Sequence, residues 1–187
     1  MNRRSNVLIL CLLLAGMILP ACMKKTVKKT QIEEAPVAEA PAPEKTDVTI
    51  GAEYAAIPQL ATVQFDTDKA ELREDARATL KKNAVVLKVI LAEVPKAEIR
   101  IEGHCDERST LEYNLALGQR RANAVKNYYG ALGIKKSALT TISYGEEKPV
   151  CQESREECWW RNRRGETTVR SVSGPVRIPR EKLSSVQ

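Results

Sequence analysis

A segment near the N-terminus, from Met23 to about Pro58, contains too few large apolar residues to form a core. Lys, Glu, Ala and Pro dominate it, with APVAEAPAPEK at its centre. Such a segment cannot bury enough apolar surface to offset the entropy lost on ordering, so it is predicted to be a flexible tether. The residues that can build a core therefore lie between about Ala61 and Val172, a length that suits one domain.

Strand and helix patterns alternate through this part of the chain. Ile99 and Ile101 alternate with charged residues, as in a half-buried strand, whereas apolar and small residues from Leu72 onward recur at helical spacing until Pro95 ends the pattern. The predicted strands are 62–65, 99–102, 139–144 and 167–172, and the predicted helices are 72–94, 112–129 and 154–162. The order βαβαβ(α)β predicts an α/β (α+β) sandwich, with helices packed on one mixed sheet.

The first residues predict export. Arg3 and Arg4 precede an apolar run from Val7 to Leu19, which is typical of a secretory signal peptide. The run is shorter than the roughly 20 residues that a membrane-spanning helix needs. Residues 1–21 are therefore predicted to be a signal peptide.

The end of this leader, Leu19-Pro20-Ala21-Cys22, resembles a bacterial lipobox. The resemblance implies that Cys22 is lipidated, and acyl chains on one residue anchor a protein stably to a membrane. Met23 follows the cysteine in place of Asp, which implies the periplasmic face of the outer membrane. The predicted organisation is a signal peptide (1–21), a lipidated tether (22–60), a folded domain (61–172) and a polar, frayed tail (173–187).

The charge of the chain does not indicate a nucleic-acid partner. The formal net charge of +6 falls to +4 when Arg3 and Arg4 leave with the signal peptide. The basic residues alternate with acidic ones and do not form a stripe. We therefore expect a mixed-charge surface and no nucleic-acid binding.

Three cysteines remain after Cys11 leaves with the leader and Cys22 takes lipid. In an oxidising compartment, Cys151 and Cys158 are close enough in sequence for a disulfide. The alternative is a pair of reduced, partly buried thiols. Cys105 is left without a partner.

The stretch EGHCDERST, residues 102–110, places a thiol beside an imidazole and a carboxylate. On a strand, Cys105 continues the face of Ile99 and Ile101, whereas His104 and Asp106 point to the opposite face. A nucleophilic cysteine needs a base within hydrogen-bonding reach. We therefore expect no enzyme activity, no cofactor and no metal site, and we expect Cys105 to be a small buried residue.

The end of this strand and the following helix present complementary charges. Asp106 lies where the strand runs into a loop, and Arg121 lies in the helix that follows. Together they suit a zwitterion, because a carboxylate accepts from an ammonium and a guanidinium clamps a carboxylate. An intramolecular ion pair between Asp106 and Arg121 is an equally good interpretation, and their spacing does not decide between the two.

Four segments resemble the peptidoglycan-associated lipoproteins of the OmpA-like domain family in order and spacing. They are VQFDTDKAEL, EGHCDERSTLEYNLALGQRRANAVKNYY, ISYGEEKP and WWRNRRGETTV. The resemblance covers about Val63 to Val172. It implies a domain that binds the peptide stem of peptidoglycan, through meso-diaminopimelate, without cleaving it.

The resemblance also implies the binding residues. Asp106 would pair with the diaminopimelate ammonium and Arg121 with its carboxylate. The remaining residues expected to line the pocket are Arg108, Thr110, Phe65, Asp66 and Leu117. Ser109 stands where the family usually has Gly, and the segment from Cys151 to Trp160 differs from the family pattern.

Trp159 and Trp160, with the arginines that follow them, could be interpreted as a patch for single-stranded nucleic acid. A periplasmic lipoprotein meets little nucleic acid, so we expect one Trp in the core and a structural role for Arg163 and Arg164. Tyr128 and Tyr129 are expected to be one surface and one core residue.

Together with the lipobox and the tether, the family resemblance implies an outer-membrane lipoprotein that tethers the membrane to the cell wall. Membership of the Tol-Pal system, with TolB as a second partner, is implied by the resemblance alone. One alternative is a wall anchor outside any Tol complex. Another is a redox or hydrolytic enzyme that uses Cys105, which would require an exposed thiol of low pKa.

Overall fold

The computed structural model describes residues 47–184. The predicted signal peptide, the lipidated Cys22 and the tether as far as residue 46 lie outside the described residues. No helix within residues 47–184 is long and apolar enough to cross a membrane.

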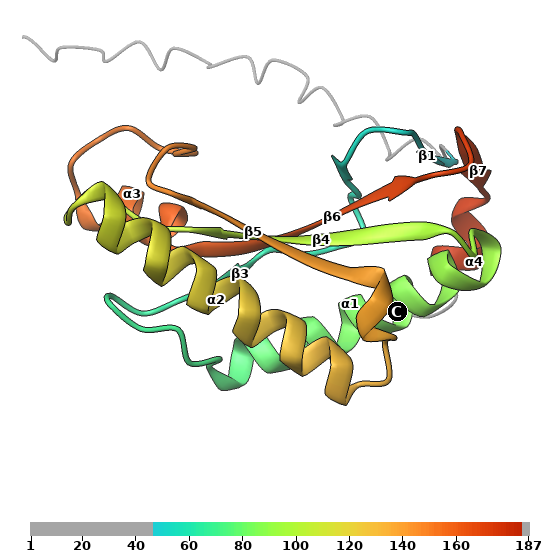
Figure 1. Ribbon diagram of the computed structural model, residues 1–187, viewed down its shortest axis with the longest axis horizontal. Coiled ribbons are helices and arrows are strands. Elements are labelled where there is room, and N and C mark those ends of the chain that lie inside the picture. The colour runs from blue at the N-terminus through green and yellow to red at the C-terminus, as the bar shows by residue number, and fades with distance from the viewer. Residues whose placement is uncertain (1–46, 185–187) are drawn as a thin grey trace, which may run out of the picture. The chain divides into compact units, whose positions relative to one another are not determined.

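A mixed sheet forms the centre of the domain (Figure 1). Its strands are β2 (Ala55–Ala56), β3 (Val63–Gln64), β4 (Ala97–His104), β5 (Leu139–Gly145) and β6 (Arg164–Ser171). The order is β2-β6-β4-β5, and β3 pairs with the other end of β6. Because β4 is parallel to β5 and antiparallel to β6, the predicted mixed sheet is confirmed.

Two long helices, α1 (Glu74–Glu93) and α2 (Leu111–Ala131), lie on the same side of this sheet (Figure 1). The predicted helical layer is therefore confirmed. The Thr110 side chain caps the N-terminus of α2 by accepting from the backbone N–H of Tyr113 at 3.3 Å. The hydroxyl of Thr110, a residue expected to line the binding pocket, therefore lies at this cap.

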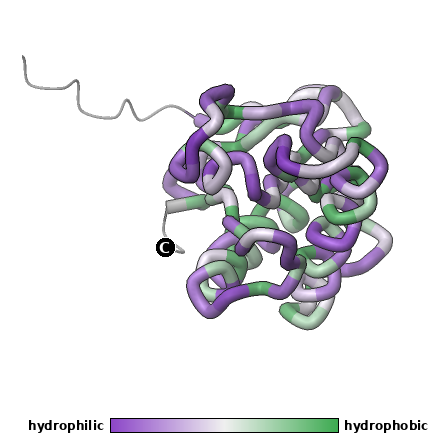
Figure 2. Tube along the Cα trace, turned by 90° about the vertical axis from the view of Figure 1, so that its left-hand side faces the viewer, coloured by the Kyte–Doolittle hydropathy of each residue, from purple (hydrophilic) through white to green (hydrophobic). Residues whose placement is uncertain are grey.

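The core lies between the helices and the sheet. Ile99 and Ile101 on β4 are completely buried, as are Leu87 and Ile90 on α1, and Figure 2 shows apolar segments gathered inside the fold. Tyr129 is also buried, whereas its neighbour Tyr128 is only partly buried. The burial of Ile99 and Ile101 follows the alternation predicted for this strand.

The start of α2 lies unusually close to the end of β4. A Cβ atom on Gly103 would lie 1.9 Å from the carbonyl oxygen of Gly118 and would clash with it. Residues without a side chain therefore allow the two backbones to come this close. The β4–β5 register also shifts between Gly103 and His104. This close approach brings the loop after β4 beside the first turns of α2.

The folded region extends beyond both predicted boundaries. β1 (Val48–Ile50), predicted to be tether, pairs with β7 (Val176–Ile178), predicted to be frayed tail. The tail then forms α4 (Arg180–Ser184), in which Leu183 is completely buried. The prediction of a domain limited to 61–172 is wrong, because three-residue strands carry too little periodicity to be recognised without their partner.

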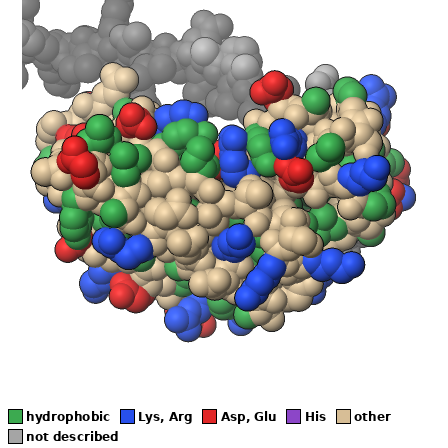
Figure 3. All heavy atoms as spheres, viewed as in Figure 1, with side chains coloured by type: hydrophobic (Ala, Val, Ile, Leu, Met, Phe, Trp, Pro, Cys, Tyr) green, Lys and Arg blue, Asp and Glu red, His purple; other side chains and the backbone are tan. Residues whose placement is uncertain are grey.

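Two further helices complete the described region. η1 (Lys136–Ala138) is a short 3-10 turn before β5, and α3 (Glu156–Asn162) precedes β6. The latter matches the predicted helix 154–162. On the face shown in Figure 3, Lys and Arg side chains are interspersed with Asp and Glu, which agrees with the predicted mixed-charge surface.

Candidate ligand-binding site

A pocket of about 390 Å³ opens where the loops after β3 and β4 meet the start of α2. All three segments contribute polar groups. Its lining residues are Thr67, Asp68, Asp106, Arg108, Ser109, Tyr113, Asn114 and Leu117. The pocket thus contains Asp106, Arg108 and Leu117 of the predicted site residues.

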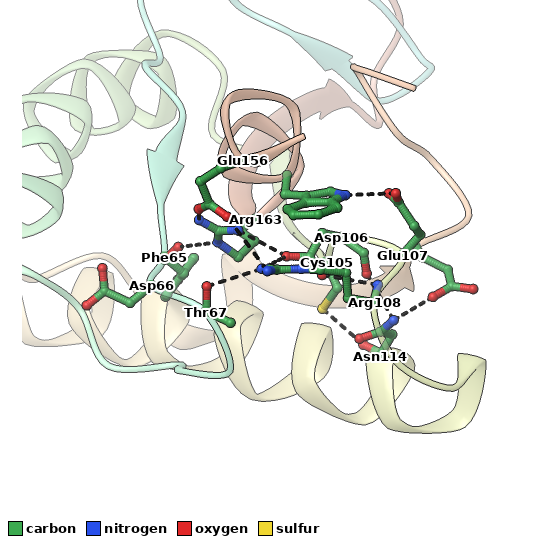
Figure 4. A network of polar contacts seen from close by, with 12 residues as sticks. Phe65, Asp66, Thr67, Cys105, Asp106, Glu107, Arg108, Asn114, Glu156 and Arg163 are labelled. Carbon is green, nitrogen blue, oxygen red and sulfur yellow. Dashed lines mark hydrogen bonds and ion pairs between the residues drawn. The ribbon is translucent and has the colours of Figure 1, made fainter. Parts of the chain in front are cut away.

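Asp106 is the most heavily bonded acid of this pocket (Figure 4). Its Oδ2 accepts from Nη2 of Arg108 at 2.8 Å and from Nη1 of Arg163 at 3.1 Å, and its Oδ1 accepts from the backbone N–H of Arg108 at 3.2 Å. Burial by itself raises the pKa of the Asp106 carboxyl, but these hydrogen bonds outweigh it, and the net pKa lies below its usual value. The carboxylate is therefore ionised at neutral pH.

Strand alternation predicted that Asp106 would lie on the face opposite α2, and this prediction is wrong. β4 ends at His104, so the alternation stops there. Beyond it, the side chain of Asp106 lines the same pocket as Asn114 and Leu117 of α2. The Asn114 amide also donates to the backbone carbonyl of Asp106 at 3.0 Å.

Arg121 is completely buried and does not line the pocket. Its guanidinium donates to three backbone carbonyls, those of Lys69 (2.8 Å), His104 (2.8 Å) and Asp66 (3.0 Å). Within residues 47–184 it forms no ion pair with Asp106, which pairs with Arg108 and Arg163. Of the two interpretations that the sequence left open, the intramolecular Asp106–Arg121 ion pair is therefore not formed. The guanidinium thus links the loop after β3 to the end of β4.

The predicted residues Phe65 and Asp66 lie behind the pocket wall. Phe65 is completely buried, and its ring centroid is 5.1 Å from the Arg121 guanidinium carbon. The Asp66 carboxylate faces away to Arg73 at 3.3 Å. Their neighbours Thr67 and Asp68 line the pocket in their place, and Tyr113 donates its hydroxyl hydrogen to Asp68.

The OmpA family matches residues 64–163 of this chain, from β3 to the end of α3. This stretch contains every segment that forms the pocket. The chain belongs to the OmpA family.

Relatives within this family share about half of the chain. The peptidoglycan-associated lipoprotein of Rhizobium meliloti is 49% identical over 105 residues, which span 56% of this chain and 57% of that protein. The protein of the same name from Brucella melitensis is 46% identical over 105 residues, 56% of this chain and 60% of that protein. The aligned stretch is thus little more than half of each relative.

Two solved structures share the fold. The crystal structure of the peptidoglycan-associated lipoprotein from Burkholderia pseudomallei superposes with a TM-score of 0.54 and 38% identity, over 58% of this chain and 89% of that chain. The C-terminal domain of Helicobacter pylori MotB gives a TM-score of 0.54 at 19% identity, over 67% of this chain and 91% of that chain. The second likeness shows the fold alone.

Sequence reasoning missed two residues that hold Asp106 in place in this OmpA-family domain, one through its carboxylate and one through its backbone. Arg163, at the end of α3, donates to Asp106, to the Phe65 carbonyl at 3.2 Å and to Glu156 at 2.5 Å. Asn114 holds the Asp106 backbone. Arg163 lies 57 residues from Asp106, and no local pattern indicates that they meet. It was assigned a structural role only.

Ser109, which stands at the usual glycine position of the family, does not need a left-handed conformation. Among residues 47–184, Asp68 is the non-glycine residue with a positive φ, 58°. A side chain at position 109 is therefore compatible with this loop.

Cys105 does not have the surroundings of a nucleophile. It is 3% exposed, and its thiol donates to the carbonyl of Asn114 at 3.3 Å. Burial raises the pKa of the Cys105 thiol, which keeps it protonated. His104 lies apart from it and stacks on Tyr144, with ring centroids 5.4 Å apart. The predicted burial of Cys105 is confirmed.

Glu102, His104 and Glu166 lie close enough together, within 4.8 Å, to be considered as metal ligands. Arginines already occupy both carboxylates, because Arg100 donates to Glu102 at 2.7 Å and Arg164 donates to Glu166 at 2.5 Å. Burial, together with the charges of Arg164 and Lys148, lowers the pKa of His104 to about 3. This cationic environment opposes the binding of a further cation.

The predicted disulfide is present. Cys151 and Cys158 are bonded, with their Cα atoms 5.2 Å apart. The prediction that one Trp of the following pair enters the core is wrong, because Trp159 and Trp160 are both only partly buried. They contact arginines near the pocket, at the end of the sheet.

Proposed function

We propose that this chain binds peptidoglycan noncovalently and that the Asp106 pocket receives the zwitterionic end of meso-diaminopimelate in the stem peptide. Relatives named peptidoglycan-associated lipoproteins support the choice of polymer. The pocket supports the choice of stem peptide, because it presents an ionised carboxylate and a guanidinium within 2.8 Å of each other.

Asp106 is proposed to accept from the ligand ammonium. It retains capacity for this, because two ionised oxygens offer about four acceptor sites and three are in use. Arg108 is the guanidinium most open to a ligand carboxylate, since its side chain is 33% exposed. Leu117 and Thr67 would contact the apolar part of the ligand.

The proposed role of Arg121 as a carboxylate partner is restricted by its surroundings. Its Nη2 carries two hydrogens and, among the described residues, donates only to the Asp66 carbonyl. A ligand carboxylate would have to bond to the second hydrogen, and this requires a shift of the surrounding loops because Arg121 is completely buried. Thr110, Phe65 and Asp66 would act by shaping the backbone around the pocket.

Titration calorimetry of the full chain in detergent, with a disaccharide tetrapeptide that contains meso-diaminopimelate, tests this function. We expect native binding and a loss of at least tenfold in affinity for Asp106→Asn, because a charge-assisted hydrogen bond is lost. Glu53→Gln, an exposed acid in the β1–β2 connection, is the matched control and should bind as the native chain does. Equal binding by Asp106→Asn and the native chain would refute the assignment of the pocket.

We further infer that the chain is a non-enzymatic lipoprotein, anchored at the periplasmic face of the outer membrane through Cys22, and that TolB is a second partner of the Tol-Pal type. The lipobox resemblance and the names of the relatives support this placement. If TolB covers the same pocket, muropeptide should displace it in a pull-down assay. Binding of TolB that is indifferent to muropeptide would contradict a shared surface, and no binding would leave a wall anchor outside any Tol complex.

A further inference from the structure

The disulfide-closed segment before β6 is held rigidly at both ends. Cys158 is completely buried and bonded to Cys151. The Asn162 side chain closes the same segment, because it accepts from the backbone N–H groups of Val150 (2.9 Å) and Cys151 (3.1 Å) and donates to the Cys151 carbonyl at 2.7 Å. The short helix α3 therefore presents its side chains in a defined orientation.

Trp159 on this helix contacts two consecutive residues of the loop after β4. Its indole Nε1 donates to Oε1 of Glu107 at 2.7 Å, and the Arg108 guanidinium lies 4.3 Å from its ring centroid. Ser154, from the same disulfide-closed segment, donates to the same Glu107 oxygen at 3.1 Å. The segment thus contacts the loop that carries Asp106 through two side chains of that loop, Glu107 and Arg108.

Trp160 contacts the arginines on the other side of the pocket. Its ring centroid lies 4.9 Å from the guanidinium of Arg73 and 5.6 Å from that of Arg163. Arg73 donates to the carboxylate of Asp66 at 3.3 Å, and Arg163 donates to Asp106. The two adjacent indoles therefore connect α3 to the loops after both β3 and β4.

These contacts address a weakness of the pocket. Arg108 is a long, partly exposed side chain, and one ion pair with the buried Asp106 carboxylate does not by itself hold such a flexible side chain in one rotamer. An aromatic ring against the guanidinium adds a cation–π attraction and restricts its rotamers. A side chain that is already ordered loses less entropy when a ligand binds.

We propose that Trp159, held by the Cys151–Cys158 disulfide, is a positioning residue of the Asp106 pocket, and that Trp160 has the same role toward Arg73 and Arg163. Trp159 sets the orientation of Arg108 and so the affinity for the stem peptide. The proposal rests on the proposed function and concerns the segment in which this chain differs from the family pattern.

Titration calorimetry of the full chain in detergent, with the meso-diaminopimelate disaccharide tetrapeptide, tests the proposal on three variants. Trp159→Ala should weaken binding about tenfold, whereas Trp159→Phe, which keeps a smaller aromatic ring against Arg108 but loses the N–H donor, should weaken it about threefold. The double variant Cys151→Ser/Cys158→Ser should also weaken binding. Arg155→Ala is the matched control, because the side chain of this neighbour in the same segment pairs only with the exposed Glu153 among the described residues.

A second readout separates positioning from general stability. In the folded protein without ligand, the Asp106 carboxyl carbon can be titrated by NMR. Trp159→Ala should raise the pKa of Asp106 toward its ordinary value, because Arg108 then donates to it only part of the time, and Trp159→Phe should restore much of the native pKa. Arg155→Ala should leave it unchanged.

Native affinity and an unchanged Asp106 pKa in Trp159→Ala would overturn the proposal. If the native chain itself does not bind the muropeptide, the proposed function fails, but the pKa of Asp106 still decides the role of Trp159 because that titration needs no ligand.

Discussion

Replacement of Arg121 by Met should destabilise the fold severely. The side chain is completely buried, and its loss leaves the carbonyl oxygens of Lys69, His104 and Asp66 without their donor. An unsatisfied buried polar group costs about 1–3 kcal/mol. The hydrogen bond to His104 is fully buried, whereas the other two are only partly buried and can regain water. We therefore expect Arg121→Met to lower the free energy of unfolding by about 3–5 kcal/mol.

Urea unfolding followed by circular dichroism, with linear extrapolation to water, measures this loss. Arg120→Met is the matched control, since Arg120 is an exposed neighbour on the same helix and its replacement should change the free energy of unfolding by less than about 0.5 kcal/mol. Arg121→Lys keeps the charge but lacks the planar fork, so it should fall between the two. A loss below about 1 kcal/mol for Arg121→Met would refute the reasoning that Arg121 organises the two loops.

Three further outcomes are expected. The pKa of His104 is lowered to about 3 in the fold and is about 6.5 in an unfolded chain. The contribution of His104 to stability is therefore full above about pH 6.5 and is lost as the pH falls toward 3, because only the unfolded chain takes up the proton. The urea midpoint of His104→Gln should change less between pH 7 and pH 4 than the native midpoint. Cys105 should react with a thiol reagent only after unfolding, as peptide mapping would show, and rapid labelling of the folded chain would contradict its burial. Gly118→Ala should lower the free energy of unfolding by about 1–3 kcal/mol, because its Cβ would lie 2.3 Å from Oγ of Ser143 and 2.9 Å from the Gly103 carbonyl oxygen. Gly130→Ala is its control in the same urea assay, because the nearest neighbour of its Cβ would be a flexible Lys136 carbon at 3.4 Å.

Local periodicity was sufficient to predict the long elements. The apolar spacing that ends at Pro95 corresponds to α1, and the alternation at Ile99 and Ile101 corresponds to β4. Both patterns report burial of one face, which is a property of the sequence within the element. The short strands β1 and β7 escaped prediction because each becomes recognisable only when paired with the other, more than 120 residues away.

In the candidate site, too, features within one segment were predictable from the sequence, whereas contacts between distant segments were not. The sequence alone indicated that Asp106 and Arg108, separated by one residue, lie where a buried strand runs into a loop. It also indicated the Cys151–Cys158 disulfide, whose partners are near neighbours in sequence.

Only the tertiary structure decided what Asp106 and Arg121 contact. Asp106 bonds to Arg163, and Arg121 bonds to carbonyls of the loop after β3 and of His104 at the end of β4, so an ion pair between the two does not form. Spacing along a chain places two charges on neighbouring elements, but the direction of a long guanidinium depends on which unpaired carbonyls the packed loops present to it. Those carbonyls come together only when the loop after β3 folds over α2, and no pattern within a single segment encodes that meeting.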